Sequence, residues 1–393
     1  MYNLISVISF WGFMIEQTKR QSNIELLRIF AALGVVILSY NDSSLGGGFA
    51  FVEDSSFNEF IMVVFESLFI CVFNVYVMIS GYFNRDSVKR DVLKPIKSIT
   101  MFLVFELAAY LIKELPKGEP FSFKTLFGYF SPSYWFIFLF FALYLISPFI
   151  SLLWSHMKLP AKKALLGVFI TLFSVYPFVW DVISHLNKYS FWNEPSLNGI
   201  MQGISPISLF GSDKGYTLIN FILMYLIGCY LRDKIENGLK ERPGNLLVIL
   251  GVNLVLIVCW TFADRMFTGF DLQTTVCWNF ENPLIIIESV ALFRFFNSLK
   301  IKSNKVINAL AAGVYPTYLI HINLLEYLQI ERFVQSGTAI MVLHMLGCMF
   351  GLFLVSFLIY TLYDLLTRPL FNMISKKWKR YRYIVAGRLN HNR

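Results

Sequence analysis

An arginine and a serine lie eleven residues apart in the apolar stretch NIELLRIFAALGVVILSYND, and together they could act on one ligand. Eleven residues of α-helix rise about 16 Å and complete about three turns, so Arg28 and Ser39 would share a face. The Arg28 guanidinium suits the anionic end of an elongated ligand, while the reacting end would lie near Ser39. A serine hydroxyl needs a base to take its proton, so this spacing calls for a further partner.

Each of these two residues also has a purely structural explanation. Arg28 lies about one turn into the apolar stretch, where a long side chain can extend to the inner headgroups of a bilayer. Ser39 is a small residue of the kind that lets membrane helices pack closely. Both explanations stay open on the sequence alone.

His321, in the string VYPTYLIHINLL, is the best candidate for a base. A neutral imidazole, whose ordinary pKa is about 6.5, accepts a proton at neutral pH. Tyr315, Tyr318 and His321 recur every three residues, so on a helix they would share one face. Alternatively, His321 is a hydrogen-bonded histidine with a packing role only. His344 is a weaker candidate, because it has fewer neighbours that could take part in a reaction.

Arg85 and Arg90 lie in the basic segment NRDSVKRDVLKPIK, residues 84–97. Arginine is well suited to phosphate groups, so these two side chains could contact the phosphates of a ligand. A basic cluster between two apolar stretches is also what the positive-inside rule predicts for a cytoplasmic loop.

Ionisable residues inside apolar stretches are costly in a bilayer, so each is a functional candidate. Further examples are Glu25, Glu66, Glu106, Glu288, Arg294 and His344. The loop 41–59 is polar, glycine-rich and acidic, without a basic residue. It could admit a sugar, although a simple connecting loop explains it equally well.

The composition indicates a membrane protein, because 56% of the 393 residues are hydrophobic and 15% are charged, against about 25% charged in soluble domains. All five cysteines fall in apolar runs without a CxxC pair, so we interpret them as core residues. No two histidines lie at ligand spacing, so no metal site is expected. The net charge of +9 follows the predicted topology, and nucleic acid is not an expected partner.

Ten stretches are candidates to cross a bilayer, since a crossing needs about 20 mostly apolar residues. They are 24–41, 60–83, 96–114, 134–154, 163–183, 216–231, 244–263, 280–298, 306–325 and 338–364. With a cytoplasmic N-terminus, 27 of the 34 lysines and arginines fall inside and 7 outside, as the positive-inside rule requires. The sequence therefore predicts an all-α polytopic membrane protein with ten transmembrane helices and cytoplasmic N- and C-termini.

The chain divides into three segments. Residues 1–21 begin with an apolar run too short to span a bilayer, so we expect a cytoplasmic or interfacial segment, with Met1 and Met14 as alternative starts. Residues 22–365 hold all ten predicted spans and form one membrane domain. Residues 366–393 form a basic cytoplasmic tail that suits an anionic leaflet.

Five apolar strings, in their order and topology, resemble the acyltransferase-3 family of membrane O-acyltransferases, which modify cell-surface sugars and related acceptors. The strings are SNIELLRIFAALGVVIL (22–38), NVYVMISGYF (74–83), YWFIFLFFALYLISPF (134–149), YLIGCYLRDK (225–234) and VYPTYLIHINLL (314–325). The resemblance runs from about residue 22 to about residue 365. It implies that Arg28 engages an acyl-CoA donor and that Arg85 and Arg90 lie near further donor-binding arginines. The family also places a tyrosine and a histidine in the region of His321.

Ser39 departs from the family's pattern. The family's signature on the first helix is an arginine, ten residues, and then a histidine that acts as the catalytic base. Arg28 matches the arginine, but Ser39 stands at the histidine's position. Three interpretations stay open: an inactivated variant that keeps the fold, a substitute base, for which His321 is the best candidate, or a non-enzymatic protein.

The resemblance implies an enzyme that transfers an acetyl or short acyl group from acyl-CoA to a hydroxyl of a surface polysaccharide or lipid-linked glycan. Acyl-CoA is a co-substrate here, and no bound cofactor is expected. Membrane lipids should surround the protein, in the bacterial inner or plasma membrane. The competing hypothesis is a non-enzymatic relative or a transporter or flippase of lipid-linked sugars. Against transport, the sequence lacks paired broken helices and two-half symmetry.

Overall fold

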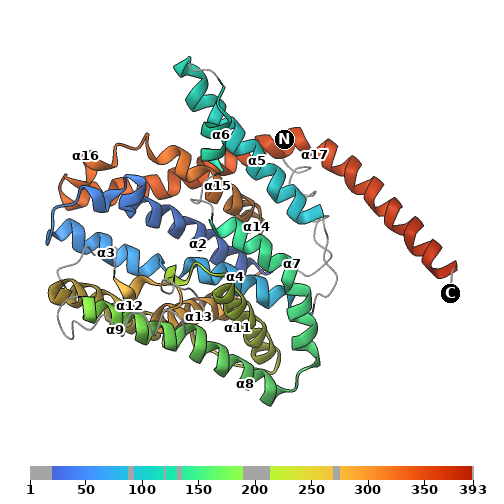
Figure 1. Ribbon diagram of the computed structural model, residues 1–393, viewed down its shortest axis with the longest axis horizontal. Helices are drawn as coiled ribbons and strands as arrows, with labels where there is room; N and C mark the ends of the chain where they lie inside the picture. The colour runs from blue at the N-terminus through green and yellow to red at the C-terminus, as the bar shows by residue number, and fades with distance from the viewer. Residues whose placement is uncertain are drawn as a thin grey trace.

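The computed structural model of the chain describes residues 20–86, 93–118, 121–130, 135–188, 213–268 and 275–391, and within them the backbone is helical without a strand (Figure 1). The helices are α2 (Ser22–Asn41), α3 (Phe57–Phe69), α4 (Val72–Asn84), α5 (Leu93–Glu114), α6 (Phe123–Tyr129), α7 (Trp135–His156), α8 (Leu159–Ile170), α9 (Tyr176–Lys188), α11 (Leu218–Glu236), α12 (Pro243–Thr268), α13 (Pro283–Ser298), α14 (Lys305–Leu310), α15 (Val314–Leu325), α16 (Ile330–Val334) and α17 (Thr338–His391). The prediction of an all-α polytopic membrane protein is confirmed.

Eight stretches of the described residues are long and apolar enough to cross a membrane. They are Ser22–Asn41, Phe57–Asn84, Pro95–Lys117, Phe136–His156, Leu159–Trp180, Pro243–Met266, Val276–Ser298 and Thr338–Lys376. Each overlaps one predicted span. The two remaining predicted spans are also helical, 216–231 as α11 and 306–325 as α14, a 3₁₀ turn and α15. The count of ten and the cytoplasmic placement of both termini stay predictions.

Helix α2 lies at the centre of the bundle. It packs against α3 and α4 on one side and against α15 and α17 on the other (Figure 1). Its side chains are apolar on nearly all faces, and residues such as Leu27, Ala31 and Val36 are completely buried. A helix without a polar face belongs in the interior of a bundle. Helix α2 thus holds Ser39 between the neighbouring helices, where its side chain stays partly exposed.

Two glycines bring helices α4 and α11 into close contact. A Cβ atom added to Gly81 would overlap the backbone carbonyl of Tyr225, and one added to Gly228 would overlap that of Met78. Small residues at such crossings allow membrane helices to pack backbone against backbone. This contact fixes the C-terminal half of α4, and Arg85 follows directly after that helix.

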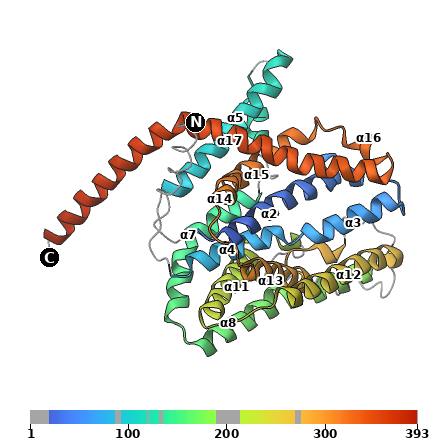
Figure 2. The same cartoon turned by 180° about the vertical axis from the view of Figure 1, so that it is seen from behind.

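Helix α17 contains 54 residues, which corresponds to about 81 Å at 1.5 Å per residue. Its first part packs against α2 and α15, and its C-terminal part projects away from the bundle (Figure 2). The bilayer core is about 30 Å thick, so the helix extends far beyond it. The predicted boundary at residue 366 falls inside this helix, and no change of secondary structure marks it.

Candidate active site

Arg28 and Ser39 lie on one unbroken helix, because α2 runs without interruption from Ser22 to Asn41. The two side chains are therefore about three turns and about 16 Å apart along the axis, as the spacing predicts. The apolar residues between them keep this distance fixed by packing into the surrounding helices.

Ser39 and His321 meet at the contact between α2 and α15. The Oγ atom of Ser39 lies 2.9 Å from Nε2 of His321, although 282 residues separate them in the chain. Pro316 lies in the first turn of α15, where proline is tolerated, so the helix continues regularly to His321. The structure thus brings Ser39 and the candidate base together.

The backbone carbonyl of Thr317 determines which nitrogen of His321 carries the proton. His321 Nδ1 lies 2.8 Å from this oxygen, which can only accept a hydrogen bond. Nδ1 therefore holds the proton, and the lone pair of Nε2 faces the serine hydroxyl, which donates to it. A hydroxyl, an imidazole and a group that orients the imidazole form the arrangement of an activated nucleophile. Thr317 was not predicted, because its role uses only its backbone.

Ser39 and His321, which we call the dyad, differ in their exposure to solvent. His321 is only 1% exposed, whereas Ser39 is partly exposed. Ser39 therefore lies on the accessible side of the dyad, and the imidazole is covered.

Tyr318 contributes to the walls around His321, whereas Tyr315 does not. The rings of Tyr318 and His321 lie 6.0 Å apart between centroids, and Phe73 and Phe136 pack on Tyr318 at 6.5 and 5.6 Å. The hydroxyl of Tyr315 instead donates to the carbonyl of residue 98 on α5, at 3.1 Å. Tyr318 thus packs near His321, whereas Tyr315 contacts α5, although both tyrosines lie on the helix that carries His321.

Arg28 is partly exposed and already has an anionic neighbour. Its Nη1 lies 3.2 Å from Glu25 one turn earlier, with side-chain exposures of 33% and 10%. Its guanidinium lies 5.6 Å from the centroid of the Phe83 ring, and Tyr76 donates to its backbone carbonyl at 3.1 Å. The i, i+3 spacing of Glu25 and Arg28 in the sequence is typical of such an ion pair on a helix. An incoming phosphate would compete with Glu25.

Arg85 lies in an ion-pair network at the end of α4, paired with Asp86, Asp233 and Glu236. Its hydrogen bonds lower the pKa of the Asp86 carboxyl. The network joins α4 to α11, which gives Arg85 a structural role. Arg90 lies outside the described residues.

Two further polar pairs lie just beyond Ser39. Asn41 donates to Glu66 Oε2 at 3.0 Å, and the Tyr40 hydroxyl lies 2.9 Å from His344 Nδ1. The His344 ring also stacks on Phe333, with centroids 3.7 Å apart. Both pairs hold α2 against its neighbours, and His344 fills a packing position.

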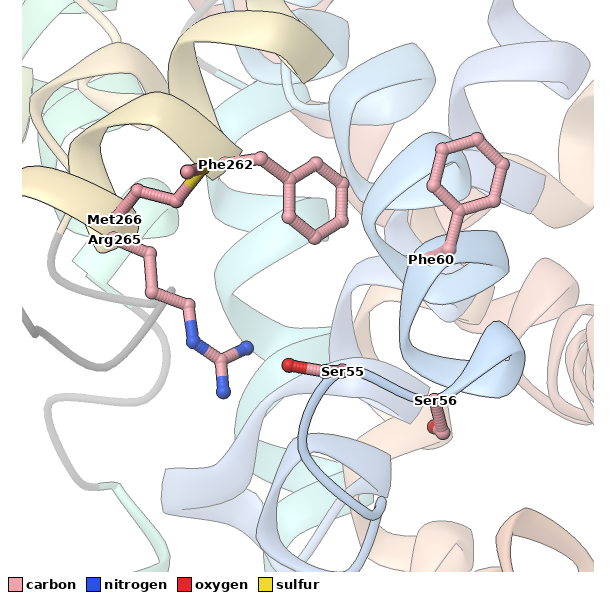
Figure 3. Close-up of a pocket in the computed structure, with 6 residues that line it drawn as sticks. All are labelled: Ser55, Ser56, Phe60, Phe262, Arg265 and Met266. Atoms are coloured by element: carbon pink, nitrogen blue, oxygen red, sulfur yellow. The ribbon is translucent and has the colours of Figure 1, made fainter.

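A pocket between the start of α3 and the end of α12 contains none of the predicted site residues (Figure 3). It is lined by Ser55, Ser56, Phe60, Phe262, Arg265 and Met266. Arg265 is held there by ion pairs with Asp54 and Glu59 at 3.0 and 2.6 Å. No group of three potential metal ligands occurs in the described part of the chain.

The profile of the family described as "Acyltransferase domain" matches residues 21–361 and thus most of the chain, including Arg28, Ser39 and His321. The chain belongs to the acyltransferase-3 family. No curated protein and no solved structure matches the chain. With its apolar helices, this member of the acyltransferase-3 family is a multi-pass membrane protein.

Proposed function

We propose that the chain is a membrane O-acyltransferase that moves an acetyl or short acyl group from acyl-CoA to a hydroxyl of a surface polysaccharide or lipid-linked glycan. The 2.9 Å contact between Ser39 and His321 carries the proposal. By the family resemblance, a histidine is expected at position 39. Here an imidazole reaches that position from α15. The chain keeps a base at the reacting position, which favours an active enzyme over an inactivated variant.

The proposed donor path follows α2. The phosphates of acyl-CoA would lie near Arg28 on the predicted cytoplasmic side, where its guanidinium is partly exposed. The thioester would then reach Ser39, about 16 Å further along the helix. The acceptor would enter from the opposite side, past the loop 41–59. The proposed setting is the bacterial inner or plasma membrane.

The test is acyl-CoA binding and turnover by the purified full chain in lipid nanodiscs, with a methyl glycoside as acceptor. Wild-type protein should bind acetyl-CoA and release CoA, whereas His321→Gln should bind it and turn over at least about 10²-fold more slowly. Ser39→His serves as the comparison. Turnover by Ser39→His alone would mean that the natural chain is inactivated. If no variant binds acetyl-CoA, the acyltransferase proposal fails and transport of lipid-linked sugars becomes the better hypothesis.

A further inference from the structure

His321 can accept a proton only at Nε2, and the hydroxyl of Ser39 already occupies that nitrogen. Nδ1 donates to the Thr317 carbonyl at 2.8 Å, and Nε2 accepts from Ser39 at 2.9 Å. With the proton on Nδ1, Nε2 has one lone pair in the ring plane and Ser39 donates to it, so no second acceptor position remains on the imidazole. An acceptor hydroxyl could reach Nε2 only by displacing the serine.

The burial of the dyad points the same way. His321 is 1% exposed and lies behind Ser39, which is the partly exposed member. A thioester that arrives along α2 therefore lies nearer to the serine hydroxyl than to the imidazole. This hydroxyl is already hydrogen-bonded to a base, which is the condition for an activated nucleophile.

We infer that Ser39 is the nucleophile and that the acyl group is carried as an ester on its Oγ between donor and acceptor. The inference rests on the proposed function, which supplies the acyl-CoA and the acceptor hydroxyl. It gives His321 two successive roles, as a base toward Ser39 and then as a base toward the acceptor.

Each of the two steps balances without a further reagent. In the first, the Ser39 proton moves to Nε2, the bond from Oγ to the acyl carbon forms, and the carbon–sulfur bond breaks. The CoA sulfur takes the proton from His321 and leaves as the free thiol. In the second, the acceptor hydroxyl gives its proton to Nε2 and attacks the ester carbon. The ester bond to Ser39 breaks, and Oγ recovers that proton from His321.

The group that orients His321 limits the rate of this dyad. A backbone carbonyl is neutral, so it stabilises an imidazolium less than the carboxylate of a catalytic triad does. In serine proteases, changing that carboxylate to an amide lowers kcat about 10⁴-fold because the imidazole takes the wrong tautomer, whereas the Thr317 carbonyl keeps the tautomer that this reaction needs. A thioester is a more reactive acyl donor than a peptide bond, which reduces the demand on the base.

Isotope exchange tests the inference without requiring the intermediate to accumulate. The full chain in nanodiscs is mixed with unlabelled acetyl-CoA and labelled free CoA, with no glycoside present. If Ser39 carries the acyl group, label should enter acetyl-CoA, because the free thiol can attack the acyl-serine. Ser39→Ala should lose both exchange and glycoside acylation by about 10³-fold or more. Ser155→Ala is the matched control, since Ser155 also lies near a histidine nitrogen, at 3.3 Å.

The opposing outcomes are distinct. Glycoside acylation by wild-type protein without CoA exchange would overturn the inference and leave the proposed function intact. Acylation that persists or increases in Ser39→Ala would also overturn it, since His321 would then act on the acceptor directly. Failure of wild-type protein to bind acetyl-CoA would instead overturn the proposed function. If Ser39→Ala does not fold, Ser39→Cys should yield a hydroxylamine-sensitive acyl group on residue 39, detected by mass spectrometry, and its absence counts against the inference.

Discussion

Replacing an imidazole by a hydroxyl removes a base only if no other base lies within hydrogen-bond distance. Ser39 on its own would hold its proton at neutral pH. With Nε2 of His321 at 2.9 Å, the hydroxyl has a partner that can take that proton. Under the mechanism proposed above, Ser39 is therefore the nucleophile and His321 supplies the base.

Arg28→Ala should raise the KM for acyl-CoA by about 10- to 100-fold with little change in kcat, because a charge-assisted contact to phosphate contributes about 1.5–3 kcal/mol. Steady-state kinetics at saturating acceptor measure this effect. Arg294→Ala is the matched control, since Arg294 is also partly exposed and paired with a glutamate, Glu241 at 2.6 Å. Equal KM values for both variants would show that Arg28 does not hold the donor.

Among the contacts between helices, Arg85 is paired with carboxylates of the protein itself. Arg85→Ala should lower the free energy of unfolding by about 1–3 kcal/mol, because Asp233 loses one of its cationic partners. Asp233 keeps Lys162, whose Nζ lies 2.7 Å away, so the loss should stay within that range. Thermal unfolding in detergent should show a lower Tm while the KM for acyl-CoA is unchanged. A raised KM at unchanged Tm would support the donor-binding role predicted from the sequence.

The crossing of α4 and α11 should tolerate no side chain at its glycines. Gly81→Ala should destabilise the protein by about 1–3 kcal/mol, because a methyl group there overlaps the Tyr225 carbonyl and forces the helices apart. Gly251→Ala on α12 is the control, since a Cβ atom there has nothing within 4 Å. Thermal unfolding of both variants in the same detergent compares them directly. A Gly81→Ala protein as stable as the control would contradict the close contact.

For the whole molecule, topology is the property to test. The positive-inside asymmetry predicts that residue 393 and the loop near residue 300 are cytoplasmic and that the turn at residue 118 is external. A green fluorescent protein fused after residue 393 should fluoresce in cells, and alkaline phosphatase fused after residue 118 should be active. With a cytoplasmic N-terminus, the opposite pattern would require an even number of spans before residue 118 and an odd number before residue 393.

Sequence reasoning predicted the helical stretches, because a bilayer demands apolar residues wherever the chain crosses it. It did not predict the break of 306–325 into α14, a 3₁₀ turn and α15, since hydropathy is continuous across that turn. The helical period assigned Arg28 and Ser39 to one face of α2, yet a period within one helix does not identify the neighbouring helix. The contact with His321 depends on how α2 packs against α15, and this packing is a property of the assembled bundle.

The two members of the dyad come from opposite ends of the chain, 282 residues apart. At a synthesis rate of about 5–20 residues per second, a ribosome that has made α2 needs about 14–56 s more to make residue 321. A nascent chain therefore holds a serine without its base while most of the bundle is still being inserted. Under the proposed function, incomplete products would therefore be unable to use acyl-CoA, and activity would appear only among the last events of biosynthesis.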